Sequence, residues 1–217
     1  MIIIAIDGPA AAGKGTLAKR LATTLNLPYL DTGLLYRATA KRVLEAGGNP
    51  EDSEAATAAA KALTQADTTR ADLRDAVTSK AASQVASIPA VRAALLAYQR
   101  EYGSANGAVL DGRDIGTVIF PHADVKLFVT ASVEARAKRR QAEFLAKGES
   151  VALADVIADV AARDEADRTR AAAPLLPAED AIFIDTTTLN ADEAFAHAMM
   201  EIANKAGILE RIPALKG

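Results

Sequence analysis

The chain has 217 residues, none of which is cysteine and only two of which are histidine, His122 and His197. Without cysteine the protein can have neither a thiol nucleophile nor a disulfide, and two histidines so far apart argue against a histidine-rich metal site. A chain of this length needs no such crosslink, because it can bury roughly 70% of its unfolded surface. The sequence therefore predicts one compact domain stabilised by packing.

An excess of charge of one sign is also missing. The formal net charge is −3 at pH 7, which gives no overall attraction to nucleic acid, so any anion must be bound by local clusters of arginine and lysine. The apolar run at residues 2–6 is too short to span a membrane and lacks the basic segment that begins a signal peptide. We expect a cytoplasmic protein that binds neither nucleic acid nor a membrane.

The stretch GPAAAGKGT, which follows this apolar run directly, is typical of a phosphate-binding loop between a strand and a helix. Gly8 and Gly13 permit backbone angles that turn the N–H groups of the loop toward phosphate oxygens at the N-terminus of the helix. Lys14 would place its charge on the β- and γ-phosphates. The residues expected to bind phosphate are Gly8, Pro9, Ala10, Ala11, Ala12, Gly13, Lys14, Gly15 and Thr16.

The loop departs from the most common P-loop pattern at one position. Gly15 separates Lys14 from Thr16, whereas motors, switches and transporters have serine or threonine directly after the lysine. GKGT is similar to the loop of nucleoside monophosphate kinases. A plain glycine turn between a strand and a helix is the alternative interpretation.

Short apolar runs alternate with helical periodicity along the chain. Strands are expected at residues 2–6, 29–31, 108–110, 125–130 and 182–185. Helices are expected from the loop to Leu25, at 33–45, from Pro89 onward, from Ser132 to Lys147, at 153–170, and in a closing helix that carries Phe195, Met199 and Ile202 and ends at Gly207 before a tail with Pro213. This alternation predicts an α/β P-loop NTPase fold of three layers, with a mostly parallel five-stranded sheet and ligands at the carboxyl ends of its strands.

Charged side chains gather where the predicted strands end. The residues at or just beyond a strand end are Lys14, Asp31, Asp111 and Asp185. Segment 111–114 is the densest, with two acids and a base around a glycine, in a position where this architecture binds ligands. Thr32 is expected to cap the next helix, and Arg37 is suited to bind a second phosphorylated ligand. A capped helix with a surface arginine is the alternative.

Three charged residues share one face of the helix expected at 153–170. Arg163, Asp167 and Arg170 are spaced i, i+4 and i+7, so they project from one side and can serve one ligand. The same pattern fits a solvated helix held by Asp–Arg pairs. The basic residues of the preceding helix fit either a solvated face or a group that closes over phosphate; they are Arg136, Arg139 and Arg140.

Seven strings of residues, spread over nearly the whole chain, make the sequence resemble the bacterial cytidylate kinases. They are IDGPAAAGKGT, YLDTGLLYR, AASQVASIPAVR, LDGRDIGTVIFP, ADVKLFVTAS, RDEADRTRAAAPLLPA and IDTT. The resemblance implies a monomeric enzyme that transfers the γ-phosphoryl group of ATP to CMP or dCMP, with Mg²⁺ as cofactor.

The resemblance also implies how a single kinase domain over residues 1–217 is divided. The core would comprise residues 1–48, 89–131 and 171–217, with a small acceptor-binding insert at about 49–88 and a helical lid at about 132–170. Many family members carry a longer, β-rich insert, whereas residues 50–72 here are few and rich in alanine. Because residues 50–69 lack strand signals, a helical and weakly structured insert is expected there.

On the donor side, the resemblance assigns Gly8 to Thr16 to the phosphates of ATP, with Arg139 and Arg140 closing over them as part of the lid. Thr16 is expected to bind the metal, and Asp111, at a strand end, is expected to hold the water shell of the metal. No catalytic base is needed, because the acceptor oxygen is already anionic near neutral pH. Positioning and charge stabilisation must therefore carry the reaction.

On the acceptor side, the resemblance assigns separate groups to phosphate, base and ribose. The residues expected around the acceptor phosphate are Arg37, Arg113 and Arg170, with Arg163 as the bridge to the donor. Those expected to recognise the cytosine edge are Ser83, Arg92 and Asp114, while Asp167 would contact the ribose hydroxyl with Thr32 nearby. The expected catalytic residues are Lys14, Arg113, Arg163 and Arg170.

Two alternative functions remain open. A P-loop switch would bind nucleotide and signal to a partner, but it has no evident use for a second cluster of arginines. A kinase for UMP, AMP or a non-nucleotide alcohol would differ only in its acceptor. Cytosine is favoured because Asp114 can accept a hydrogen bond from its N4 amino group while Arg92 donates to N3 or O2, and uracil reverses both requirements.

Overall fold

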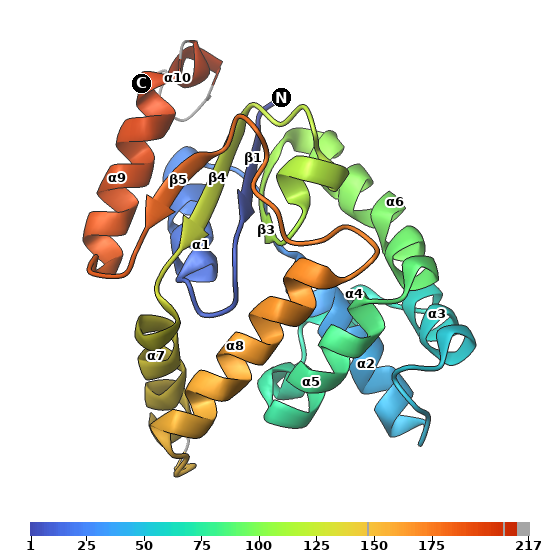
Figure 1. Ribbon diagram of the computed structural model, residues 1–217. Coiled ribbons are helices and arrows are strands. Elements are labelled where there is room, and N and C mark those ends of the chain that lie inside the picture. The colour runs from blue at the N-terminus through green and yellow to red at the C-terminus, as the bar shows by residue number, and fades with distance from the viewer. Residues whose placement is uncertain (147, 206, 212–217) are drawn as a thin grey trace.

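The computed structural model of the protein describes residues 1–146, 148–205 and 207–211. In these ranges a five-stranded sheet lies between two layers of helices (Figure 1). Its strand order is β2-β3-β1-β4-β5, and every described pair of strands is parallel. The strands are β1 (Ile3–Asp7), β2 (Tyr29–Asp31), β3 (Ala108–Gly112), β4 (Val125–Thr130) and β5 (Ile182–Asp185). The predicted three-layer P-loop fold is confirmed.

The two faces of the sheet pack into separate hydrophobic cores. On one face, Ile4 and Ile6 of β1 contact α1 (Lys14–Leu25) and α9 (Ala191–Asn204). On the other face, Ala5 packs with residues of β3, of α6 (Pro89–Asn106) and of η2 (Ile115–Ile119), a turn of π-helix. Burial on both faces explains why the strands appear in the sequence as continuous apolar runs.

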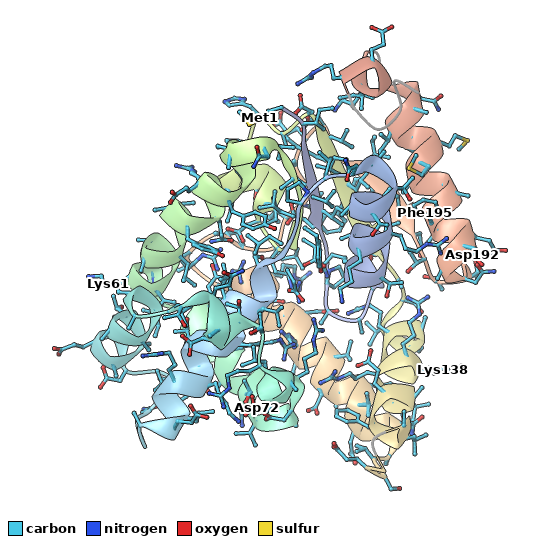
Figure 2. All side chains as sticks on the ribbon, turned by 180° about the vertical axis from the view of Figure 1, so that it is seen from behind. Met1, Lys61, Asp72, Lys138, Asp192 and Phe195 are labelled. Atoms are coloured by element: carbon cyan, nitrogen blue, oxygen red, sulfur yellow. The ribbon has the colours of Figure 1, made fainter. Side chains whose placement is uncertain are left out.

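The helices beside the sheet follow their sequence signals. In α1, Leu17, Leu21 and Leu25 are buried, and the helix ends at Asn26, which adopts the left-handed conformation common at helix C-termini. In α9, Phe195 and Met199 pack against the same core as α1, and Figure 2 shows Phe195 on the side of α9 that faces α1. These predicted faces are confirmed.

The insert is better packed than predicted. The helices within the predicted insert are α3 (Ser53–Lys61), α4 (Gln65–Thr68), the 3-10 helix η1 (Ala71–Arg74) and α5 (Ala76–Ala86). Helix α2 (Thr32–Glu45) precedes them. Asp52 caps α3 by accepting hydrogen bonds from two backbone N–H groups, and Ala56 and Ala60 are buried in the core that α3 shares with α2, α5 and α6. The expected helical character of residues 50–69 is therefore confirmed by α3 and α4, but the expected weak structure is wrong. Small side chains replace large ones in this core, so helix α5 gave no periodic signal and was not predicted.

Helices α7 (Val133–Ala146) and α8 (Leu153–Thr169) form a pair that projects beyond the carboxyl ends of the strands (Figure 1). Ser132 caps α7 as predicted, accepting a hydrogen bond from the N–H of Ala135 at 3.2 Å. The predicted helix end at Lys147 and the predicted tail with Pro213 lie outside the described residues. After Gly207 the chain forms a short helix, α10 (Ile208–Arg211), which was not predicted. None of the helices in the described ranges has the length and hydropathy to cross a bilayer.

Candidate active site

The register of the central strands brings the predicted site segments together at the carboxyl ends of the strands. Asp31 at the end of β2 pairs with Asp111 of β3, and Asp7 of β1 pairs with Gly112. The P-loop and segment 111–114 therefore leave the sheet side by side. Asp185 does not join them, because β4 separates β5 from β1, and its carboxylate instead accepts hydrogen bonds from Thr187.

The backbone of the P-loop explains its two key glycines. Gly8 has a φ of +144°, and a Cβ there would lie 1.9 Å from the carbonyl oxygen of Val129 in the neighbouring strand. Gly13, at the start of α1, has a φ of +87°. No other residue fits at Gly8, and a side chain at Gly13 would strain the backbone.

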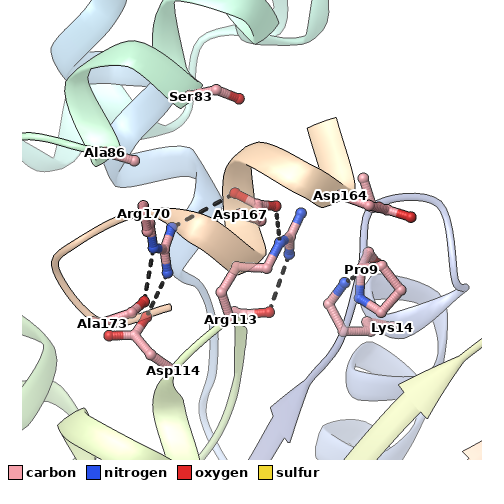
Figure 3. Close-up of polar contacts among 12 residues, drawn as sticks. Pro9, Lys14, Ser83, Ala86, Arg113, Asp114, Asp164, Asp167, Arg170 and Ala173 are labelled. Carbon is pink, nitrogen blue, oxygen red and sulfur yellow. Dashed lines mark hydrogen bonds and ion pairs between the residues drawn. The ribbon is translucent and has the colours of Figure 1, made fainter. Parts of the chain in front are cut away.

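Lys14 is folded back into this loop. Its side chain is buried, and its ammonium donates a hydrogen bond to the carbonyl oxygen of Pro9 at 2.7 Å (Figure 3). Burial and the nearby Arg113 lower the pKa of Lys14 to about 7. A buried amine whose charged form is disfavoured gains most from an arriving anion.

Three arginines and two aspartates from separate elements form a continuous chain of ion pairs. Arg113 donates to Asp167 of α8 at 2.8 Å, and Asp167 lies 3.6 Å from Arg170. Arg170 in turn lies 3.7 Å from Asp114 (Figure 3), which also pairs with Arg92 of α6. Asp167 is buried, so this face of α8 meets segment 111–114, and its interpretation as a solvated face is wrong.

Two further arginines, Arg163 and Arg37, are partly buried and form no ion pair with another residue of the described ranges. The Nε of Arg163 has no hydrogen-bond partner, and burial together with Arg113 lowers its pKa to about 10. Arg37 donates to Ser79 and to the carbonyl oxygen of Leu73, and burial together with Arg163 lowers its pKa to about 10. Partly buried guanidinium groups that repel one another are typical of a binding site for an anion.

Some predicted residues lie elsewhere or bind differently. Ser83, on α5, donates to the carbonyl oxygen of Ser79 at 3.5 Å, and its expected contact with the cytosine edge stays a prediction. Thr32 does not cap α2, because Asp31 occupies the capping position and the Thr32 hydroxyl donates to the carbonyl oxygen of Asp111 at 2.8 Å. This bond instead ties the start of α2 to the end of β3.

The two arginines predicted to belong to a lid have different partners. Arg139 donates to the hydroxyl of Thr186 at 3.0 Å and also to its carbonyl oxygen, and the same hydroxyl lies 3.0 Å from the carbonyl oxygen of Ala12 in the P-loop. Arg140 instead pairs with Glu143 on its own helix at 2.8 Å. Arg139 is therefore connected to the loop through Thr186, and Arg140 is held on α7.

Sequence reasoning assigned no individual role to Arg136, which the structure places under the P-loop. Its side chain is 3% exposed, pairs with Asp164 of α8 at 2.9 Å and donates to the carbonyl oxygen of Ala10 at 3.2 Å. One residue thus joins α7, α8 and the loop. Its spacing within a basic helix carried no signal that distinguished it from Arg139 and Arg140.

The predicted metal-binding residues offer few ligands. Asp111 is 5% exposed and accepts a hydrogen bond from the Tyr29 hydroxyl at 3.3 Å, and both burial and the neighbouring Asp31 raise its pKa. A Cβ on Gly15 would lie 3.4 Å from the Asp111 carboxylate, which places this carboxylate beside the residue that precedes Thr16. Within the described ranges, no three acidic or histidine side chains are grouped to hold a metal. One carboxylate and one hydroxyl fit Mg²⁺ that is held mainly by phosphates and water.

Comparison with known proteins agrees with this geometry. Residues 4–204 match the family model described as cytidylate kinase. The chain belongs to the cytidylate kinase family. It is thus a nucleoside monophosphate kinase, and the resemblance inferred from its motifs is confirmed.

Similar proteins extend over almost the whole chain. A cytidylate kinase of Acidiphilium cryptum is 60% identical over 204 residues, covering 94% of this chain and 96% of the relative. One of Paramagnetospirillum magneticum is 56% identical and covers 94% and 98%. Among solved structures, an uncharacterized protein from Eubacterium ventriosum shares the fold, with a TM-score of 0.53 at 14% identity over 94% of this chain and 99% of that one.

Proposed function

We propose that the protein transfers the γ-phosphoryl group of ATP to CMP or dCMP. The observation that supports this proposal is that two groups of cationic side chains lie at the carboxyl ends of the strands: the P-loop with Lys14, and the partly buried Arg37 and Arg163 with the ion-paired Arg113 and Arg170. A kinase that transfers a phosphoryl group between two phosphorylated ligands uses both groups. A nucleotide switch uses only the first and is not favoured.

On the donor side, the backbone N–H groups of the loop would bind the phosphates of ATP. Lys14 would leave the carbonyl oxygen of Pro9 for the β- and γ-phosphates, which restore the counter-charge that its buried amine lacks. Thr16 and, through water, Asp111 would hold Mg²⁺, which neutralises charge on the transferring group when it is bound. Arg139 and Arg140 would complete this side of the site from the lid.

On the acceptor side, Arg37, Arg113 and Arg170 would bind the phosphate of CMP, and Arg163 would stabilise charge between donor and acceptor. The acceptor oxygen attacks without a base, since it is already ionised near neutral pH. Asp167, held by Arg113 at 2.8 Å, would accept a hydrogen bond from the ribose. The protein then contributes orientation and positive charge rather than covalent chemistry.

Asp114 and Arg92 would select the base, and Thr32 would lie nearby. Both charged side chains are nearly buried, at 6% and 10% exposure, and they pair with each other, so a base whose hydrogen-bonding edge does not match them brings polar atoms into a buried site without partners. Uracil presents an acceptor where Asp114 needs a donor, and such mismatches reduce kcat/KM by roughly 10³-fold or more. Ser83 would join this group from α5 when the insert closes.

We also propose that residues 49–88 act as an acceptor-binding insert and 132–170 as a lid on a core that is otherwise rigid, in a monomeric enzyme. An assay of ATP consumption against CMP, dCMP, UMP and AMP tests the proposed function directly. We expect rapid turnover with the cytidine nucleotides and slow turnover with the others. ATP consumption that does not depend on an acceptor would instead support a switch, and equal rates with UMP would refute selection by the base.

A further inference from the structure

Asp7, the last residue of β1, is a buried carboxylate that has no role in the proposed mechanism. It is 5% exposed, and its two oxygens accept hydrogen bonds from the N–H groups of Ile115 at 2.8 Å and Gly116 at 2.7 Å. These donors lie in the first turn of η2, where backbone N–H groups have no partner within the helix. Asp7 therefore caps a helix that lies more than one hundred residues away in the chain.

The residue that would normally cap this turn is Asp114. It occupies the N-cap position of η2, and its carbonyl oxygen accepts the first hydrogen bonds of the helix, from Val118 and Ile119. Aspartate is a preferred capping residue, yet the Asp114 side chain makes no capping bond. Its carboxylate points instead to Arg92 and Arg170.

Helix η2 is also held by contacts with strands β1 and β4 and by a hydrogen bond just beyond its C-terminal end. A Cβ on Gly116 would lie 3.1 Å from the side chain of Lys126 and 3.4 Å from the Asp7 carboxylate, so the turn rests directly on β1 and β4. The ammonium of Lys126 donates to the carbonyl oxygen of Pro121 at 2.6 Å, beyond the end of η2. Two charged residues of the central strands thus hold the segment that starts with Asp114.

We propose that Asp7 is a positioning residue for selection of the acceptor base: by capping η2 in place of Asp114, it leaves the Asp114 carboxylate free to face the base and sets where that carboxylate lies. This inference rests on the proposed role of Asp114. Without Asp7, the N–H groups of Ile115 and Gly116 lose their acceptor, and the side chain of Asp114, which occupies the N-cap position of the same helix, can take its place. Binding of cytosine then competes with capping of the helix.

The test compares kcat/KM for CMP and UMP in Asp7→Asn, Asp7→Ala and Gly116→Ala. Asparagine retains one acceptor oxygen and alanine none, so the CMP/UMP ratio should fall in the order wild type, Asp7→Asn, Asp7→Ala, by about tenfold or more in the last. Gly116→Ala disturbs the same contact from the helix side without changing charge and should lower the ratio as well. It keeps the test informative if Asp7→Ala does not fold.

Asn190→Ala is the matched control. Asn190 also caps a helix, α9, by accepting hydrogen bonds from two backbone N–H groups, and it lies away from the site. Its loss should lower the melting temperature and leave the CMP/UMP ratio unchanged. If the Asp7 and Gly116 variants behave like Asn190→Ala, losing stability but not selectivity, the inference is overturned.

Asp114→Asn separates this inference from the proposal on which it rests. If Asp114→Asn abolishes the preference for CMP while the Asp7 variants keep it, only the role of Asp7 is wrong. If Asp114→Asn itself keeps the preference, recognition by Asp114 is wrong and the inference about Asp7 falls with it. Support requires that both substitutions reduce the ratio.

Discussion

The ammonium of Lys14 donates a hydrogen bond across the P-loop to the carbonyl oxygen of Pro9, at 2.7 Å. In the described ranges the side chain has no ion-pair partner within 4.0 Å, so its buried charge stabilises the unliganded protein little. The contact closes the loop upon itself. Arriving phosphates would replace the carbonyl oxygen.

We therefore expect Lys14→Ala to reduce kcat by about 10²- to 10³-fold while the protein keeps its fold. The reason is that the phosphates of ATP lose the buried positive charge of the Lys14 ammonium, whereas the loop backbone is held by other contacts. Circular dichroism and thermal unfolding should match the wild type. Lys138→Ala, an exposed lysine on the outer side of α7 (Figure 2), is the control and should change neither property. A Lys14→Ala enzyme with most of its activity would contradict the P-loop assignment.

Tyr29→Phe should weaken the response to Mg²⁺. The Tyr29 hydroxyl donates to Asp111, and loss of such an orienting bond commonly costs about tenfold in metal affinity. We expect the Mg²⁺ concentration needed for half-maximal activity to rise, with a parallel loss in Mn²⁺ binding followed by electron paramagnetic resonance in the presence of ATP. Tyr102→Phe removes a hydrogen bond to the carbonyl oxygen of Tyr29 without touching Asp111. Equal effects in the two variants would show that only packing is involved.

Arg136→Ala should be among the most destabilising substitutions on the lid. It removes a buried charge that connects α7, α8 and the P-loop, and it leaves Asp164 without its partner. Arg136 is 3% exposed but Asp164 is 26% exposed, so the loss should be about 2 kcal/mol. Arg168→Ala, which breaks the exposed pair of Arg168 with Glu165 within α8, should change the free energy of unfolding by less than about 0.5 kcal/mol. Urea unfolding of both variants provides the measurement. If the two variants lost a similarly small part of the free energy of unfolding, Arg136 would stabilise the protein no more than an exposed ion pair does.

The stability of the protein should depend on pH because the carboxyl group of Asp7 is buried. Burial raises its pKa from 3.8 to about 6. Between these two values the native state binds more protons than the unfolded state, so the stability of the wild type falls as pH rises from about 4 to 6. Relative to Asp7→Asn, which does not titrate, the wild type should lose up to about 3 kcal/mol across this window. Urea unfolding at a series of pH values measures this difference, and a constant or increasing difference would contradict the shift.

Ligand binding should make the protein more compact. Arg37 on α2 and Arg163 on α8 are partly buried cations that repel one another, and an anion between them would remove this repulsion. A bisubstrate analogue that carries both nucleotides should therefore draw the insert and the lid together. Small-angle scattering with and without the analogue should show a smaller radius of gyration in the complex. Superimposable curves would argue against a moving lid.

Where local signals were strong, the sequence predicted the fold closely. The bounds of β2, β4 and β5 agree with the predicted strands, because each is a short apolar run bounded by polar residues or proline. Helix α5 was missed because its buried face consists of small or polar residues and a single valine, so the sequence shows no periodic pattern of large apolar residues there. Thr32 was misplaced by one position, since Asp31 and Thr32 both fit a capping site and only the backbone distinguishes them.

The sequence by itself determined the P-loop, the family and which charged residues stand at strand ends. These features are encoded in contiguous motifs and in local periodicity, so no knowledge of distant residues is needed to find them. Only the tertiary structure decided that Asp167 holds Arg113, that Arg136 supports the P-loop and that Asp7 caps η2. Each of these contacts joins segments far apart in the chain, and it depends on the register of β1 with β3 or on how α7 and α8 pack, which spacing along a sequence does not specify.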